Sequence, residues 1–321
     1  MKYMYALLLS VLLIISGTTS SAQSSDPDFK IIDDYVKSLG TLDTLNTGTI
    51  SYIVTKKFPE AKDKVRAIFD WIAYNITFDL KAGKNNDNEK INTDLVLKSR
   101  KANAAGYAAL FQDMCSVVKI RCLTVAGYAK YKTEQIEEKP EEFNHTWAVV
   151  QLGVSPDTWY YVDPAWGSGY TDDKMTKYTK EYNDDYFFAD RYIFNYQHFP
   201  DNDAWQLGPG PKSASSFLSL PLVKSAAYEY KLGKFSPNNG MVKAKLNSPV
   251  SFNIKLNPGA QVDIVSLVIG EEKKKKTKTV DYTFSGGSII FNYKFDQEDT
   301  YPVTVLINNK PILGYIFEVN E

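Results

Sequence analysis

The sequence predicts an α+β domain, in which helices pack on an antiparallel sheet, followed by an all-β sandwich. Residues 60–77 and 103–118 carry apolar side chains three and four positions apart, the spacing of helices with one buried face. Residues 145–152 and 159–163 alternate instead, and they flank a turn cluster as the strands of a hairpin do. Beyond residue 219 the helical period gives way to alternation, which places a separate all-β region at the C-terminal end.

Composition narrows the possible functions. The 321 residues are 44% hydrophobic and 14% aromatic, which is enough for one or two buried cores. The formal net charge of −1 offers no basic excess for binding nucleic acid. The two histidines and two cysteines stand at unrelated spacings, so we expect no metal site. We expect no cofactor either.

Residues 1–22 have the pattern of a secretory signal peptide. Lys2 precedes the apolar run Ala6–Ile15, which is too short to cross a bilayer as a helix. Small residues then lead to Ala22, after which we expect cleavage. The mature product is expected to be exported, to a periplasm or the cell exterior, with no integral membrane segment.

Residues 23–59 are predicted to form a helical lead-in. A first helix is indicated by apolar residues at Ile31, Ile32, Tyr35, Val36 and Leu39. Gly40 is placed to end it, and a threonine-rich linker is expected through Thr49. The helix at 60–77 has the apolar stripe Val65, Ile68, Phe69, Ile72 and Ile76. Residues 81–92 are charged and are expected to form a surface loop.

The helix over 103–118 leads into a strand through Leu123–Val125. Its apolar face consists of Tyr107, Leu110, Phe111, Met114, Cys115 and Val118. Cys115 and Cys122 flank the turn between this helix and the strand. They either form a disulfide, which an oxidising compartment favours, or are two buried thiols.

The hairpin predicted at 145–163 brings two polar residues together. His145, Trp147 and Val149 share one face of the first strand, and Gly153–Asp157 forms the turn. The returning strand, Trp159–Asp163, ends beside the start of the first. An imidazole at residue 145 would therefore lie within reach of the carboxylate at residue 163.

Several separated motifs resemble the transglutaminase-like superfamily, and they occur in the family's order. They are Trp71-x-x-x-Asn75-Ile-x-Phe-Asp79, Arg100-Lys…Gly-Tyr-Ala108, Asn144-His-Thr-Trp147 and Val162-Asp-Pro164. Two later segments are similar to the kyphoscoliosis-peptidase branch: Asp185-Tyr-Phe-Phe188 and His198-Phe-Pro-Asp201 with Trp205-Gln-Leu207. The resemblance covers residues 60–207 and implies a papain-like core.

The resemblance also implies a catalytic triad of Cys, His and Asp, and this chain retains two of the three. His145 and Asp163 fall on the family's histidine and aspartate, but Ala104 falls on its cysteine. A methyl group cannot attack a carbonyl. Cys115 cannot replace the missing thiol, because it lies about 16 Å along the same helix. The pair is therefore expected to be vestigial, beside a ligand groove lined by Tyr107, Trp147 and Trp166.

Two functions remain open at this point. One is a non-catalytic module that binds a protein or peptide, for which aromatic walls are suited. The other is a hydrolase or acyltransferase that uses His145 and Asp163 with a displaced nucleophile or with water. His198 is expected to be a packing or capping residue.

The C-terminal part is predicted to begin after a linker at residues 208–219, which is rich in glycine, proline and serine. Residues 220–321 are predicted to form a small sandwich of immunoglobulin type. Its strands are expected at residues 250–256, 262–269, 279–284, 288–295, 301–307 and 314–319. Lys273–Lys276 is expected at a solvated hairpin tip.

Overall fold

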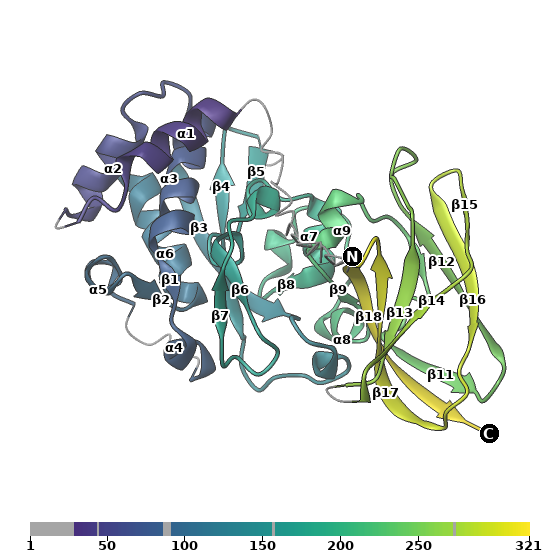
Figure 1. Cartoon of the computed structure of the whole chain (residues 1–321). Helices are drawn as coiled ribbons and strands as arrows, with labels where there is room; N and C mark the ends of the chain where they lie inside the picture. The colour runs from purple at the N-terminus through teal and green to yellow at the C-terminus, as the bar shows by residue number, and fades with distance from the viewer. Residues whose placement is uncertain (1–28, 44, 86–90, 156–157, 272–273) are drawn as a thin grey trace, which may run out of the picture.

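The structure is a computed structural model that describes residues 29–43, 45–85, 91–155, 158–271 and 274–321. The predicted signal peptide, with its cleavage site after Ala22, lies outside these residues, as do part of the turn at 153–157 and Lys273. Figure 1 shows a helical layer, a central sheet, a second group of short helices and a β-sandwich in succession. No helix among the described residues combines the length and the apolar character needed to cross a membrane.

The helical layer packs on one face of the central sheet (Figure 1). Its helices are α1 (Lys30–Leu39), α2 (Thr47–Thr55), α3 (Ala61–Asn75), α4 (Leu80–Lys84), α5 (Thr93–Ser99) and α6 (Ala104–Val117). The predicted helices at 31–39, 60–77 and 103–118 are therefore confirmed. Gly40, with a φ of 65°, follows the last residue of α1 as expected.

Helix α2 corrects the predicted linker through Thr49. The Asn46 side chain accepts a hydrogen bond from the Thr49 amide at 2.8 Å and so caps the helix. Ile50 and Val54 are fully buried one turn apart, and this burial outweighs the low helix propensity of the threonines and glycine. Helix α4 likewise occupies the start of the segment expected to be a loop at 81–92.

A buried arginine on α3 forms an ion pair with an aspartate on α1. The Arg66 guanidinium donates to both carboxylate oxygens of Asp33 at 2.9 and 3.0 Å, in a bidentate pair. It also lies 3.2 Å from Asp70 and 3.2 Å from Asp184. Arg66 is 1% exposed, so the carboxylates of Asp33 and Asp184 compensate a charge that water does not reach. Burial raises the pKa of the Asp70 carboxyl well above its ordinary value.

The central sheet is antiparallel, with the strand order β5–β4–β3–β8. Its strands are β3 (Arg121–Ala129), β4 (His145–Gln151), β5 (Trp159–Val162) and β8 (His198–Pro200). The alternation predicted for β4 is confirmed: Ala148 and Val150 join the core beneath the helices, while Trp147 and Val149 face the opposite side. The core on the Trp147 and Val149 side of the sheet is continuous with the core of the sandwich.

Short elements connect these layers. They are the parallel pair β1 (Thr77–Phe78) and β2 (Lys101–Ala102), the hairpin β6 (Gly169–Thr171) and β7 (Tyr178–Lys180), and helices α7 (Arg191–Gln197), α8 (Ala214–Leu218) and α9 (Ala226–Glu229). Helix α8 lies within the segment 208–219 that the sequence indicates as a linker.

The C-terminal region is a sandwich of two sheets, which confirms the predicted all-β region (Figure 1). One sheet has the order β10 (Phe235–Ser236), β12 (Pro249–Lys255), β16 (Ser288–Lys294) and β15 (Thr283–Ser285). The other has the order β11 (Met241–Lys245), β18 (Lys310–Asn320), β17 (Asp299–Ile307), β13 (Val265–Ile269) and β14 (Lys276–Thr279), with β9 (Leu222–Val223) also pairing with β18.

One predicted strand of the sandwich was wrong. The segment 279–284 is not continuous, because β14 ends at Thr279 in one sheet and β15 begins at Thr283 in the other. Alternation in the sequence does not distinguish a single strand from two strands that the chain joins across the sandwich. The strands β9, β10 and β11 were not predicted individually, although β9 lies in a segment expected to join the sandwich.

The two cysteines are not joined as the predicted disulfide: both are free and buried, which is the alternative left open by the sequence. Cys115 is fully buried between α6 and the sheet, and Cys122 is 7% exposed on β3. Burial, together with the adjacent Cys122 thiol, raises the pKa of the Cys115 thiol well above its ordinary value. Both residues therefore serve as small apolar core residues.

Candidate active site

The site begins at the N-terminus of α6. The Asn103 side chain accepts a hydrogen bond from the Gly106 amide at 3.0 Å, which caps the helix. Ala104 and Ala105 are the first two helical residues, and both line a cavity. Their amide groups belong to the first turn, where no helical carbonyl lies four residues earlier, and they have no hydrogen-bond partner among the described residues. The position of the expected thiol therefore carries a methyl group at the positive end of the helix dipole.

The structure brings together the two polar residues that the hairpin predicted. The Nε2 atom of His145, at the start of β4, lies 2.7 Å from Oδ2 of Asp163, just beyond the end of β5. Strands β4 and β5 are antiparallel, with Ala148 opposite Val162. The residues before Ala148 and those after Val162 therefore lie at the same end of the sheet, which places His145 beside Asp163. His145 is 8% exposed and Asp163 is fully buried.

Asp163 is fixed from both sides of its carboxylate. Its Oδ1 atom accepts hydrogen bonds from the backbone amides of Ala165 and Trp166, both at 3.0 Å, in the turn that follows Asp163-Pro164. Burial alone would raise the pKa of the Asp163 carboxyl, but His145 and His198 outweigh it and hold this pKa below its ordinary value. The carboxylate is thus ionised and accepts the proton on Nε2 of His145.

His198 is the residue that the sequence assigned to packing. Its Nε2 atom lies 3.2 Å from the same Asp163 oxygen that contacts His145. The ring stacks on Phe194 with centroids 3.9 Å apart, and burial lowers its pKa to about 4. His198 is therefore neutral at physiological pH, and it donates to Asp163 through Nε2. The motif His198-Phe-Pro-Asp201 drew attention to this histidine in the sequence, but it did not place it at the site. The pairing of β3 with β8 brings His198 there.

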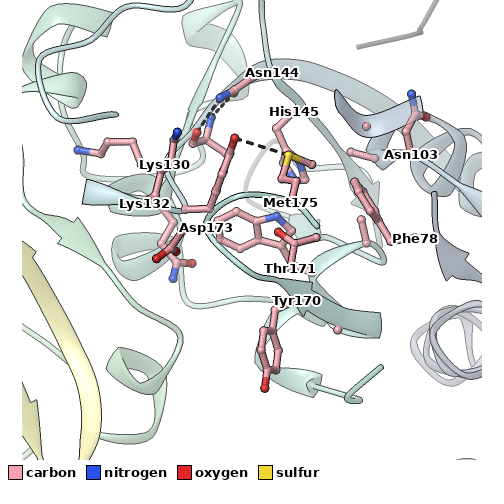
Figure 2. Close-up of a pocket in the computed structure, with 18 of the residues that line it drawn as sticks. Phe78, Asn103, Lys130, Lys132, Asn144, His145, Tyr170, Thr171, Asp173 and Met175 are labelled. Carbon is pink, nitrogen blue, oxygen red and sulfur yellow. Dashed lines mark hydrogen bonds between the residues drawn. The ribbon is translucent and has the colours of Figure 1, made fainter. Parts of the chain in front are cut away.

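Two features of β3 and β4 set the position of the His145 backbone. Gly127 lies opposite His145 in the ladder, and a Cβ atom there would come within 2.2 Å of the Phe199 carbonyl oxygen. The Asn144 side chain hydrogen-bonds both the amide and the carbonyl of Ala129, at 2.8 and 3.0 Å (Figure 2). The residue before His145 is thereby locked to the end of β3.

The cavity beside His145 has a volume of about 1010 Å³. Its walls come from α4, the start of α6, the ends of β3 and β4, the β6–β7 hairpin and the sandwich (Figure 2). The sandwich contributes Val223, Lys224, Ser225 and Pro311. The cavity is therefore formed jointly by the sequence regions that were predicted to be separate.

Only one of the three residues predicted to line a ligand groove does so. Trp166 lines the cavity, and its ring lies 5.3 Å from that of His145. Tyr107 and Trp147 were placed there wrongly, because both are fully buried. The Tyr107 hydroxyl donates to the Ile76 carbonyl at 2.7 Å, and the Trp147 ring packs beneath the site against His198. The periodicity of the sequence marks a buried face without showing which buried face meets a cavity.

Other residues complete the walls. Met175, at the turn of the β6–β7 hairpin, lies with its sulfur 3.7 Å from the Tyr131 hydroxyl (Figure 2). A Cβ atom at Gly83 of α4 would lie 3.2 Å from the Met175 methyl group. The hairpin therefore reaches both sides of the cavity, and methionine provides an adaptable surface there.

The side chains of His145, Asp163 and His198 offer donor atoms that all lie within 4.8 Å of one another, a spacing that could hold a metal ion. From their spacing in the sequence, we expected that the two histidines would not form a ligand set. The structure nevertheless brings them together. Both imidazoles, however, direct Nε2 at one carboxylate oxygen at hydrogen-bond distance. A metal would have to displace both of these protons, while the backbone amides of the 165–166 turn hold the carboxylate in place. Hydrogen bonding accounts for the cluster.

These features define the class of protein. Residues 49–164 match the sequence model of the transglutaminase-like superfamily, so the chain contains a transglutaminase-like domain. Within that class it is similar to kyphoscoliosis peptidase. It is 32% identical to the mouse protein over 263 residues, covering 77% of this chain and 39% of the relative. It is 36% identical to the human protein over 184 residues, covering 56% of this chain and 27% of the relative.

This chain thus spans less than half the length of the curated relatives it matches. A solved structure of a protein named only as a TGase is similar at 18% identity and a TM-score of 0.29, over 53% of this chain and 40% of that one.

Proposed function

We propose that this chain is an exported transglutaminase-like pseudoenzyme, which binds a polypeptide in the cavity beside His145 without cleaving or cross-linking it. The observation that carries the proposal is Ala104, which stands at the N-terminus of α6, where the related pattern has its cysteine. The helix terminus and the His145–Asp163 pair remain, but the nucleophile does not. Kyphoscoliosis peptidase is named as a peptidase, which makes polypeptide the natural ligand class to test.

The shape of the cavity supports a polypeptide ligand. A volume of about 1010 Å³ is large enough for several residues of a bound chain, and Trp166 and Phe78 supply apolar walls. Lysines and acidic residues both line it, so no single charge sign selects the ligand. Export is supported by the signal-peptide pattern over residues 1–22, with cleavage after Ala22.

The Nδ1 atom of His145 favours a second function. Asp163 occupies Nε2 of His145, and Nδ1 makes no hydrogen bond to any described residue. A basic Nδ1 atom at a cavity wall could remove a proton from water, which would then attack a bound substrate. This hydrolase needs no thiol, and its activity would depend on His145.

Restoring the thiol separates these functions. In Ala104→Cys, the helix terminus and His145 should lower the thiol pKa and make it react with iodoacetamide much faster than the thiol of the matched variant Ala109→Cys on the same helix. Native Cys115 and Cys122 are buried and should stay unmodified in both. We also expect Ala104→Cys, unlike the native chain, to cleave or cross-link casein.

The native chain provides the decisive control. Casein turnover by the unmodified protein, abolished in His145→Ala, would contradict the pseudoenzyme and establish the water-activating hydrolase instead. No turnover by the native chain, with a fast-reacting thiol at residue 104, would support the pseudoenzyme.

A further inference from the structure

The strand β6 forms part of the cavity wall and has an open edge. Among the described strands it pairs with β7 alone, in a two-stranded sheet. All three of its residues, Gly169–Thr171, line the cavity beside His145. An unpaired strand edge carries N–H and C=O groups that another extended chain can pair with.

Two backbone hydrogen bonds show which residues of this segment bond to β7. The Glu181 amide donates to the Ser168 carbonyl at 3.1 Å. The Asp172 amide donates to the Lys177 carbonyl, also at 3.1 Å. Because hydrogen-bonded pairs occur at every second residue of an antiparallel ladder, the pair between these two is formed by residue 170.

The two residues on either side of Tyr170 direct their N–H and C=O groups away from β7. None of these groups on Gly169 and Thr171 has a hydrogen-bond partner among the described residues. Gly169 is also buried, and an unpaired backbone group that is buried costs free energy. The Tyr170 side chain, 56% exposed, points away from Thr171, as alternation along a strand requires (Figure 2).

Another wall of the cavity, at the end of β3, is closed to a further strand. The Asn144 side chain bonds both backbone groups of Ala129. The Gln135 side chain accepts hydrogen bonds from the amides of Tyr131 and Lys132, at 2.9 and 3.2 Å. Side chains therefore occupy the backbone groups that a ligand would need at that wall. No described side chain covers Gly169 and Thr171 in this way.

The open groups of β6 match a main chain better than a single side chain. Gly169 and Thr171 each present one donor and one acceptor, two residues apart on the same edge. An extended polypeptide repeats a donor and an acceptor on one edge at this same spacing. Gly169 also lacks a side chain, which allows another backbone to approach closely.

We propose that β6 binds an extended segment of polypeptide as a third strand of the β6–β7 sheet. The proposal rests on the polypeptide-binding function above and specifies how the ligand is recognised. Recognition through the main chain also suits a cavity lined by charges of both signs, because it does not depend on a charged side chain of the ligand.

The test uses the full chain, the peptide acetyl-Thr-Val-Thr-Val-Thr-amide and two N-methylated forms of this peptide. Methyl groups on the second and fourth residues block one edge of the extended peptide and leave the other intact. Methyl groups on the third and fourth residues interrupt both edges. The first form should bind like the parent peptide, and the second about tenfold or more weakly, a difference of about 1.4 kcal/mol.

Backbone ¹H–¹⁵N NMR locates the bound peptide. The Tyr170 amide, which donates to β7, should be protected from hydrogen exchange in the free chain. The amides of Gly169 and Thr171 should exchange quickly in the free chain. Addition of the parent peptide should shift both signals and slow their exchange.

Two variants at residue 171 separate the main chain from the side chain. Thr171→Pro removes the N–H that points away from β7, and an edge strand tolerates proline there, so the β6–β7 ladder should persist. Protection of the Tyr170 amide checks that it does. Thr171→Ala removes the side chain and keeps the N–H. We expect the parent peptide to bind Thr171→Pro about tenfold more weakly than Thr171→Ala.

The outcomes are separable from those of the proposed function. Equal binding of the two methylated peptides, or no binding of the parent peptide, overturns strand addition. Casein binding that leaves the Gly169 and Thr171 signals unmoved overturns it as well, while polypeptide binding stands. Casein turnover by the native chain overturns the pseudoenzyme, whatever the peptides show.

Discussion

His198 and Asp163 lie 3.2 Å apart, from Nε2 to Oδ2, and this Oδ2 atom is the one that also contacts His145. One carboxylate oxygen therefore receives two imidazole donors, and the other receives two backbone amides. Every polar contact of Asp163 restricts its rotation. The orientation of His145 is consequently set by a carboxylate that three other donors hold in place.

Replacing His198 by phenylalanine tests this arrangement. The phenyl ring can keep the stacking on Phe194, but it cannot donate to Asp163. Since hydrogen bonds to charged groups are worth about 1.5–3 kcal/mol, we expect His198→Phe to lower the free energy of unfolding by that amount in urea titrations. Phe194→Leu, which disturbs the stacking and keeps the hydrogen bond, is the control. A variant as stable as the native chain would show that Asp163 does not depend on His198.

The burial of Lys130 should make the stability of the protein depend on pH. Its Nζ atom is buried and donates to the carbonyls of Phe217 and Leu220, both at 2.7 Å, and burial lowers its pKa from 10.5 to about 7. Between these values the unfolded chain binds a proton that the folded chain has lost. The free energy of unfolding should therefore rise with pH across this window, by up to about 1.4 kcal/mol per pH unit. The contribution is complete above pH 10.5 and is lost as the pH falls toward 7.

The variant Lys130→Met isolates this effect, because other groups titrate alike in both proteins. Urea unfolding at pH 7, 8, 9 and 10 should give a difference between native chain and variant that increases steadily in favour of the native chain. A difference that stays constant across the series would mean that Lys130 keeps its ordinary pKa in the folded protein.

Arg66 predicts a large loss of stability on substitution. Arg66→Met removes the cation that compensates Asp33 and Asp184, and so leaves the buried Asp33 carboxylate without its bidentate partner. Breaking a buried pair in this way costs about 3–5 kcal/mol, measurable as a shift of the urea midpoint. Lys30→Met removes an exposed pair with Asp34 and should leave the midpoint in place. Recovery of stability in the double variant Arg66→Met, Asp33→Asn would confirm the electrostatic cause.

Gly127 predicts an effect of overpacking next to the site. In Gly127→Ala the new methyl would meet the Phe199 carbonyl at 2.2 Å and the Trp147 ring at 2.6 Å. We expect a loss of about 1–3 kcal/mol and a change in tryptophan fluorescence. Gly259→Ala is the matched control, since the nearest atom to its methyl is 4.0 Å away. Equal stability of the two variants would mean that β3 can move away from β8.

The sequence predicted the parts of the site that local rules determine. A hairpin has a fixed register, so the proximity of His145 to Asp163 followed from the alternation of two strands and the turn between them. The helix that begins at Ala104 followed from its apolar period. No such rule connects His198 to Asp163, 35 residues earlier in the chain, because the contact depends on the long-range pairing of β8 with β3.

The incorrect predictions for Trp147 and helix α2 also arose because they depend on tertiary contacts. Trp147 was correctly assigned to a face of β4, but alternation did not reveal that the face is covered by α7 and the sandwich. Helix α2 was overlooked because threonine, glycine and serine have low helix propensity, while the burial of Ile50 and Val54 depends on α3 and α6. Spacing in the sequence does not report such tertiary contacts.

The shared core has a consequence for autonomous folding. Residues 49–164 match the superfamily, yet the Trp147 face of their sheet packs in one cluster with Val223 and Ala227. A polypeptide cut at residue 164 would lack β8, lose His198 and expose that aromatic face to water. The matched segment therefore does not contain its whole core, because residues of α7 and of the sandwich cover one face of its sheet.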